Sequence, residues 1–414
     1  MDDVVREAEQ FVAERWSPSG DRRAWREAVV DNGWAALRWP AEWYGRGLDD
    51  DTAKAVEDVF AAAGAPGPGQ DRFNLWAATL IAYGNDDLKR RFLRPLLLGD
   101  VNMCLLYSEP NAGSDLAGVR TTAVRDGDEW IVNGQKVWTS GAVQADYGMM
   151  LARTNWDAPK HRGISFFWFP MRQPGVEVRP LRQITGDSRF NEVFITDARV
   201  PESHRLGELD KGWWVLQTAL MYERAAMGAS SQLRLETMGG GEGAPTRPSP
   251  GSSRGIPAPD LSLVELARAT GKVGDPLVRD AVARLHALRM VNQWNAERAK
   301  ATAAAGGSSP LVSLGKLAMS QMLHFAGHTQ GLLLGMEGTL DGDQNPRARD
   351  ANYSQLNAYF TSIGGGTDQI QRNIIAERIL GLPKEPEVDR DRPYREVVGV
   401  GTARPAAQPA GPRA

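Results

Sequence analysis

One carboxylate, Glu223, stands where helical spacing calls for an apolar side chain. Together with Glu223, four apolar residues fall on one stripe at three- or four-residue steps: Trp213, Leu216, Leu220 and Met227. A carboxylate on such a stripe is costly to bury unless it is paired or functional. Burial raises its pKa toward the range of a general base. The pattern therefore indicates either a catalytic base or a structural ion pair, and the residues alone leave both open.

Two further segments combine small residues, hydroxyls and an aromatic ring. Ser108–Asp115 holds two serines and Gly113, which let a ligand approach the backbone closely. Trp138–Ser140 sets a flat ring beside two hydroxyls, which suits a planar cofactor. Each segment also has a structural interpretation, as a turn without a ligand and as a tryptophan that caps a core. Taken alone, each is explained at least as well by that structural role.

Near the C-terminus, Gly364–Arg372 places three glycines before a predicted helix. Thr367 or Asp368 can cap that helix, and a helix N-terminus can hold an anion. A capped turn without a ligand is the alternative. His324 and His328 have the spacing of a zinc-binding pair, but no acidic residue lies between them, so we expect no metal site.

The elements that must position these residues belong to a chain of 414 residues with a formal net charge of −3. No basic stripe points to nucleic acid as a partner. The single cysteine, Cys104, excludes an intramolecular disulfide framework. The first residues are polar, unlike a secretory signal, and no apolar run is long enough to span a membrane. We therefore expect a soluble, cytoplasmic protein of several domains.

Periodicity changes twice along the chain and predicts three domains. We expect an N-terminal α-helical domain at 1–104, a middle β-barrel domain at 105–206 and a C-terminal four-helix bundle at 207–386. Within the β region, four runs are predicted as strands: Glu129–Val132, Gly163–Phe169, Val176–Val178 and Glu192–Ile195. Asn133-Gly134 predicts a type I′ hairpin turn. The stretch 239–259 is predicted to be a flexible loop, and 387–414 a disordered tail.

Several segments, taken in order, resemble the acyl-CoA dehydrogenase family. Ser108–Asp115 is similar to the family's "SEP-x-AGSD" loop, and Asn133–Trp138 to its "NGxKxW" segment. Ala198–Pro201 with Gly212-Trp213 resembles its junction between strands and helices, and Gly366–Arg378 its last helix. The resemblance covers nearly the whole chain. It implies a fold that is mostly α-helical with a central β-barrel, as the periodicity predicts.

The resemblance also implies FAD as the cofactor. Ser108 would contact the flavin pyrimidine and Ser114 the pyrophosphate, while Trp138 would cover the ring system with Ser140 near N5. Thr367–Gln369 would lie against the FAD of the same or a neighbouring subunit. The residues assigned to the cofactor are Ser108, Gly113, Ser114, Trp138, Thr139, Ser140, Thr367, Asp368 and Gln369.

The implied reaction is α,β-dehydrogenation of an acyl-CoA, in which a base removes the α proton. Many family members carry this base as Glu in a "Y-E-G-T" stretch, where this chain has Gly365. Long-chain and isovaleryl-CoA dehydrogenases place it on an earlier helix, directly before an Arg. Glu223-Arg224 is similar to that arrangement, so Glu223 is the implied base. Ser114, Arg224 and Gly365 would face the substrate.

The resemblance further implies an oligomer, of identical subunits or as a heterotetramer with a sister subunit. An electron-transfer flavoprotein would accept the electrons, and the role would lie in lipid catabolism. Two alternatives stay open at this point: an acyl-CoA oxidase on the same fold, and a non-catalytic subunit that holds FAD for an active partner.

Overall fold

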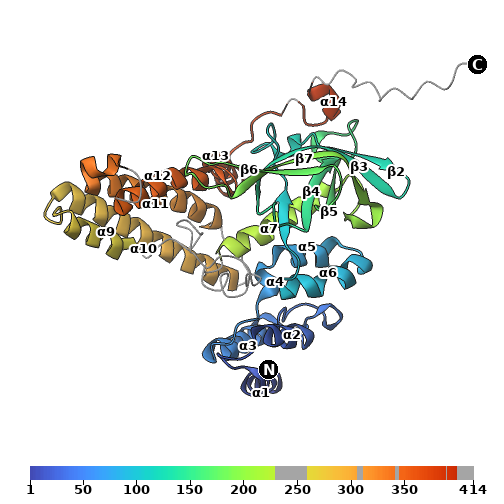
Figure 1. Ribbon diagram of the computed structural model, residues 1–414, viewed down its shortest axis with the longest axis horizontal. Coiled ribbons are helices and arrows are strands. Elements are labelled where there is room, and N and C mark those ends of the chain that lie inside the picture. The colour runs from blue at the N-terminus through green and yellow to red at the C-terminus, as the bar shows by residue number, and fades with distance from the viewer. Residues whose placement is uncertain (229–258, 305–310, 341–344, 388, 399–414) are drawn as a thin grey trace, which may run out of the picture. The chain divides into compact units, whose positions relative to one another are not determined.

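The computed structural model describes residues 1–228, 259–304, 311–340, 345–387 and 389–398. These residues form two compact units. The sheet unit comprises the described residues within Met1–Arg182, Ser188–Ala244 and Glu387–Ala414. The helical unit comprises those within Gln183–Asp187 and Pro245–Pro386. Figure 1 labels the elements of both units.

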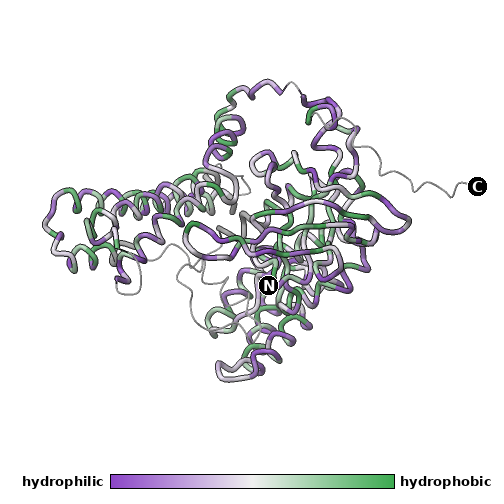
Figure 2. The backbone as a smooth tube through the Cα atoms, turned by 45° about the horizontal axis from the view of Figure 1, so that its top comes forward, coloured by the Kyte–Doolittle hydropathy of each residue, from purple (hydrophilic) through white to green (hydrophobic). Residues whose placement is uncertain are grey.

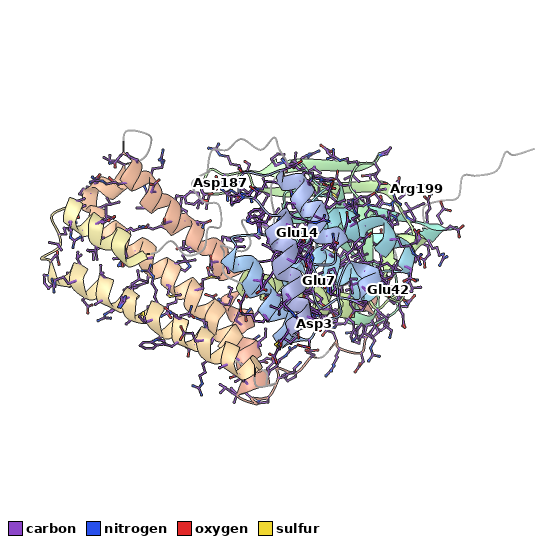
Figure 3. All side chains as sticks on the ribbon, turned by 90° about the horizontal axis from the view of Figure 1, so that it is seen from below. Asp3, Glu7, Glu14, Glu42, Asp187 and Arg199 are labelled. Carbon is purple, nitrogen blue, oxygen red and sulfur yellow. The ribbon has the colours of Figure 1, made fainter. Side chains whose placement is uncertain are left out.

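The sheet unit begins with six helices, as the periodicity predicted. They are α1 (Asp2–Arg15), α2 (Arg22–Asp31), α3 (Asp50–Ala62), α4 (Gln70–Phe73), α5 (Leu75–Tyr83) and α6 (Asp86–Leu98). Side-chain oxygens accept backbone N–H groups at four of the helix N-termini: Asp21, Asp49, Asn74 and Asn85. The acidic residues Asp3, Glu7 and Glu14 lie along α1, on its polar side (Figure 3).

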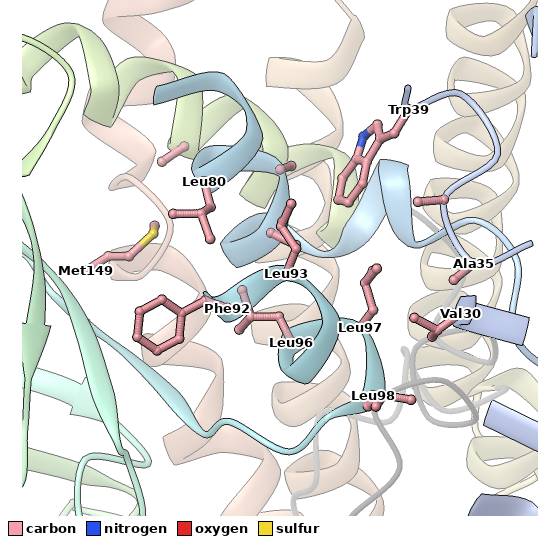
Figure 4. Packing of buried hydrophobic residues seen from close by; sticks show 14 of the residues in the cluster. Val30, Ala35, Trp39, Leu80, Phe92, Leu93, Leu96, Leu97, Leu98 and Met149 are labelled. Atoms are coloured by element: carbon pink, nitrogen blue, oxygen red, sulfur yellow. The ribbon is translucent and has the colours of Figure 1, made fainter. Parts of the chain in front are cut away.

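One hydrophobic core joins these helices to the β-strands that follow. Phe92 of α6 and Met149 of the sheet belong to the same buried cluster (Figure 4). Phe92 packs against the rings of Tyr147 and Trp168, at centroid distances of 4.8 and 5.3 Å. Helix α6 therefore packs directly against the sheet.

Eight strands form one mixed sheet. They are β1 (Met103–Leu106), β2 (Thr122–Asp126), β3 (Glu129–Ser140), β4 (Tyr147–Arg153), β5 (Ile164–Pro170), β6 (Val176–Leu181), β7 (Phe190–Pro201) and β8 (Arg205–Leu206). Their order is β6-β7-β3-β2-β4-β5-β8, with β1 also paired to β4. All four predicted strand runs lie in strands, apart from Gly163, which directly precedes β5.

The predicted closed barrel is not confirmed, because the sheet is open. Its two end strands, β6 and β8, do not pair with each other among the described residues. β8 is only two residues long, which is too short to carry a further ladder of hydrogen bonds. Among the described residues the strands therefore form an open sheet rather than a closed barrel.

The predicted turn at Asn133-Gly134 is wrong. β3 runs through both residues, and the register to β7 shifts between Val132 and Gly134, as in a β-bulge. The bulge is held by Asn133, whose Nδ2 donates to Asp197 Oδ1 at 2.9 Å. A Cβ at Gly134 would lie 2.3 Å from Thr121 Oγ1, so close packing rather than a turn explains this glycine. The hairpin turn lies earlier, at Gly127, where φ is +62°.

Helix α7 (Gly212–Gly228) belongs to the sheet unit. The helical unit contains α9 (Pro259–Ala269), α10 (Pro276–Ala304), α11 (Leu311–Leu334), α12 (Pro346–Ile363), α13 (Asp368–Ile374) and a π-helical turn (Ile375–Ile379). Along these helices hydrophilic and hydrophobic residues alternate in bands (Figure 2). Gly271, whose φ is +70°, lies in the turn between α9 and α10. The four-helix bundle and the three-domain division stay predictions.

The tail predicted to be disordered from 387 differs from the structure over its first part. Residues 394–397 form the helix α14 (Tyr394–Val397), and Tyr394 is only 3% exposed. Packing of the Tyr394 ring stabilises this segment, although the residues around it are mostly polar. Residues 399–414 lie outside the described residues, as does the loop predicted at 239–259, apart from Pro259, where α9 begins.

Candidate cofactor and substrate site

A buried ion pair links two of the segments that the sequence singled out. Lys136 is fully buried, and its Nζ donates to Glu109 Oε1 at 2.8 Å. The same ammonium donates to the carbonyl oxygens of Leu151, at 2.8 Å, and Tyr107, at 3.3 Å. All three protons of the ammonium therefore have acceptors, which is the condition under which a buried charge is tolerated.

Both oxygens of the Glu109 carboxylate also have hydrogen-bond donors. Its two oxygens accept the backbone N–H groups of Arg120, at 2.6 Å, and Thr121, at 2.9 Å. Burial by itself would raise the pKa of Glu109, but the charge of Lys136 and these donors hold it below its usual value. Burial lowers the pKa of Lys136, and Glu109 opposes that change. The pair therefore joins β3 to the loop that starts at Ser108.

Neither the ion pair nor its role was predicted from the sequence. The signal in the sequence is one pair of opposite charges, Glu109 in the first motif and Lys136 in the second. Next to the pair, the carbonyl of Ser108 accepts the backbone N–H of Val137 at 2.9 Å. The loop Ser108–Asp115 and the strand that carries Trp138 are thus hydrogen-bonded to each other.

Trp138 is not a core residue. It is 56% exposed, and its φ of +61° lies in the left-handed region that a bulky residue rarely adopts. The register of β3 against β7 shifts between Lys136 and Thr139, which turns the indole out of the sheet. The indole approaches the ring of Phe190 edge-on, with ring centroids 5.9 Å apart. The exposure contradicts the interpretation of Trp138 as a cap on the core, and backbone strain of this kind is typical of functional positions.

Two residues with hydroxyl groups, Thr139 and Ser140, follow this tryptophan in the sequence. Thr139 is fully buried, and its Oγ1 has no hydrogen-bond partner among the described residues. Ser140 is exposed. A buried hydroxyl without a partner costs free energy unless a ligand or water satisfies it. This feature favours a polar ligand beside Trp138.

The loop Ser108–Asp115 leaves room for a ligand. Ser108 is half-buried, whereas Gly113 and Ser114 are exposed. A Cβ at Gly113 would meet no heavy atom within 4 Å. The base of the loop is fixed by Asp115, whose Oδ1 accepts from Lys160 Nζ at 3.1 Å. The loop therefore offers a free hydroxyl and backbone on an anchored base.

We expect Trp138→Ala to lower the FAD content of the purified protein or to shift the absorbance of its bound flavin. The reason is that we expect a stacked flavin ring to stabilise this exposed indole and its strained backbone. The flavin-to-protein absorbance ratio measures the change, with Trp214→Ala, another exposed tryptophan, as control. Native flavin content, spectrum and reduction rate in Trp138→Ala would contradict the stacking role.

Helix α7 confirms the predicted stripe as far as it is described. Leu216 is fully buried, and Trp213 and Leu220 pack against the core of the sheet unit. Trp213 also meets His161 edge-on at 4.8 Å. Glu223 and Arg224 lie on the helix, but their side chains are outside the described residues. Their roles stay predictions.

In the helical unit, the segment before α13 is a capped turn with two left-handed glycines. Gly365 and Gly366 have φ values of +66° and +87°. Thr367 caps α13, because its Oγ1 accepts from Ile370 N at 3.2 Å. Gln369, on the first turn of α13, is exposed.

Asp368 is already engaged within the helical unit. It accepts from Lys316 Nζ at 3.0 Å and from Ser320 Oγ at 2.8 Å. Burial raises its pKa, but these two partners outweigh burial and leave the pKa below its usual value. Of this segment, Gln369 and the glycine backbone therefore have the greatest freedom to meet a ligand.

The described residues contain no group of His, Cys, Asp or Glu that could hold a metal ion. His324, one of the two histidines considered above, pairs instead with Ser362 Oγ at 3.1 Å. No helix in the described part of the chain is long and apolar enough to cross a membrane.

Three family models match the chain in sequence order. They are the acyl-CoA dehydrogenase N-terminal domain at residues 2–100, the middle domain at 104–198 and the C-terminal domain at 262–380. The match covers the six N-terminal helices, most of the sheet and most of the helical unit. The resemblance seen in the sequence motifs is thereby confirmed.

Individual proteins agree with the family models. Acyl-CoA dehydrogenase IpdE1 of Mycobacterium tuberculosis is 37% identical over 378 residues, which cover 88% of this chain and 89% of that protein. The ChsE4-ChsE5 complex from Mycobacterium tuberculosis is similar in structure, with 31% identity, a TM-score of 0.64 and coverage of 93% of this chain and 98% of that chain. The Tcur3481-Tcur3483 steroid ACAD has 26% identity, a TM-score of 0.67 and coverage of 93% and 98%. The chain therefore belongs to the acyl-CoA dehydrogenase family.

Proposed function

We propose that this acyl-CoA dehydrogenase introduces an α,β double bond into an acyl-CoA, with Glu223 as the base. The observation that carries the proposal is the strained, exposed Trp138 beside the unpartnered hydroxyl of Thr139. A ring-shaped ligand with polar edges can stack on the indole and also provide a hydrogen-bond partner for the hydroxyl. The chain is an oxidoreductase that uses FAD, and these residues are where we place the flavin.

FAD, when bound, supplies at N5 the acceptor for the hydride that leaves the β carbon of the substrate. Trp138 would cover the ring system of FAD, and Thr139 and Ser140 would provide hydroxyl groups for its polar edge. Ser108, Gly113 and Ser114 contribute hydroxyl and backbone groups to the pyrimidine edge and the pyrophosphate. The Glu109–Lys136 pair holds these two groups of residues at a constant separation.

Glu223 takes the proton from the α carbon. It lies one helical turn after Ala219, which is fully buried, and next to Tyr222, which packs against the core of the sheet unit. An apolar stripe favours the neutral form of the carboxyl after it has accepted the proton, which is what a base needs. We assign Arg224 and Ser114 to substrate binding as well, and Gly365 stands at the sequence position where other members carry their base.

For the other partners, we propose an oligomer with a sister subunit and an electron-transfer flavoprotein as electron acceptor. One of the similar solved structures is a ChsE4-ChsE5 complex, which supports pairing between unlike chains. Thr367 and Gln369 then lie against FAD of the same or a neighbouring subunit. A non-catalytic role within such a pair is disfavoured by Glu223, which a subunit without activity does not need.

The test is anaerobic reduction of the bound flavin. The purified protein, alone and with a candidate sister subunit, is mixed with acyl-CoAs from short branched to steroid-linked ones. We expect bleaching of the flavin absorbance by at least one class. No bleaching with any acyl-CoA, in a protein that holds stoichiometric FAD, would favour the non-catalytic subunit. Rapid reoxidation by oxygen would favour an oxidase.

A further inference from the structure

The C-terminal segment 389–398 packs near the proposed cofactor loop, Ser108–Asp115. In the sheet unit, α14 lies beside the sheet (Figure 1). Tyr394 stacks on Trp156 with ring centroids 5.7 Å apart and planes 21° from parallel. Its backbone N–H donates to Ala158 O at 3.0 Å, and that of Arg395 to Trp156 O at 3.1 Å. The segment therefore docks through both backbone and side chains.

The Tyr394 hydroxyl reaches the end of the cofactor loop. Its Oη donates to the carbonyl of Gly118 at 2.6 Å. Gly118 in turn closes the turn that begins at Asp115, because its N–H donates to Asp115 O at 2.9 Å. A Cβ at Gly118 would lie 3.3 Å from Asp115 Oδ2 and 3.5 Å from Tyr394 Oη. The hydroxyl, the glycine and the aspartate thus converge at one point.

A buried arginine completes the connection. The guanidinium of Arg153 lies 4.1 Å from the centre of the Tyr394 ring, which covers one of its faces. From this position it donates to Ala117 O at 2.6 Å and Val119 O at 3.2 Å, on both sides of Gly118. Burial lowers the pKa of Arg153 to about 10. The ring supplies attraction that partly offsets the burial of this cation.

We propose that Tyr394 is a positioning residue for the cofactor loop Ser108–Asp115, and that the C-terminal segment thereby contributes to FAD affinity. The inference rests on the proposed placement of the FAD pyrophosphate at Ser114. With its hydroxyl bonded to Gly118 and its ring over Arg153, Tyr394 holds the turn after Ser114 from two directions. The cofactor site then depends on a residue that lies 276 positions after Gly118 in the chain.

The test measures the dissociation constant of FAD from the full-length apoprotein, by quenching of flavin fluorescence. Tyr394→Phe keeps the stack on Trp156 and the contact with Arg153 but leaves the Gly118 carbonyl without its donor. We expect about three- to tenfold weaker FAD binding in Tyr394→Phe, the range of one lost buried hydrogen bond. Tyr394→Ala removes all three contacts and should weaken binding further. Arg392→Ala, an exposed change on the same segment, is the control.

The unfolding midpoint of each apoprotein separates positioning from general stability. Weaker FAD binding by Tyr394→Phe but not by Arg392→Ala, measured well below the unfolding midpoint of each apoprotein, supports the inference. FAD affinity equal to wild type in both Tyr394 variants overturns it, even where the midpoint falls, because the segment then only stabilises the fold. Failure of the wild-type apoprotein to bind FAD would instead overturn the proposed function itself.

Discussion

Glu223→Gln should retain FAD but lose nearly all reduction of the flavin by acyl-CoA. Loss of a positioned general base costs about 10²–10⁴-fold in rate. Glutamine keeps the size and shape of the side chain, and its amide cannot accept the α proton at neutral pH. Stopped-flow absorbance under anaerobic conditions measures the reduction rate. The flavin-to-protein ratio checks that the cofactor is still present.

Glu208→Gln is the matched control, since it removes the same charge from an exposed position just before α7. A wild-type reduction rate in Glu223→Gln would remove Glu223 from the chemistry and leave the structural ion pair as the better explanation. Gly365→Glu in the Glu223→Gln background is a second arm. If both positions face the α carbon, part of the rate should return, and the returning rate should rise with pH as the new carboxyl ionises.

Much of the secondary structure follows from the sequence, because hydrophobic periodicity decides it locally. The strand runs were located correctly, and the buried stripe of α7 is confirmed through Leu216 and Leu220. The turn at Asn133-Gly134 was wrong because the same dipeptide suits a bulge. Only the packing of Gly134 against Thr121, a long-range contact, distinguishes the two. The prediction of a closed barrel was not confirmed for a similar reason, since strand pairing is not a local property.

The candidate site was predictable in part. Its segments are visible in the sequence as clusters of hydroxyls, glycines and a tryptophan. Whether Trp138 faces solvent or the core depends on a shift in register that no local pattern records. The Glu109–Lys136 pair joins residues 27 positions apart, and the Tyr394–Gly118 bond joins residues 276 apart. Such contacts form only when the chain has folded and cannot be read from local composition. The polar composition around Tyr394 therefore suggested disorder.

Lys136→Met should destabilise the protein by about 3–5 kcal/mol at pH 7, the cost of removing one partner of a buried ion pair. The ammonium has 0% exposure, so no water replaces it beside Glu109. Urea or thermal unfolding of the apoprotein measures the loss. Lys54→Met, which breaks an exposed pair with Asp58 on α3, should cost at most about 1 kcal/mol. FAD binding should weaken as well, because Ser108 and Trp138 lose their common support.

The pH dependence distinguishes an ion pair from simple packing. In the wild type the pKa of Glu109 is below its usual value, so the carboxylate contributes stability that is full above the unfolded pKa of about 4.3 and is lost as pH falls through the folded pKa. Without Lys136, burial should dominate and raise that pKa, so the variant loses stability as pH rises from about 4 to 7. The difference in stability between the two proteins should therefore shrink toward pH 4.

Combining Glu109→Gln with Lys136→Met should remove this pH dependence and restore part of the stability, because no unpaired charge remains buried. An equal loss at pH 4.5 and pH 7.5 in Lys136→Met would show that packing, rather than charge, is what Lys136 contributes.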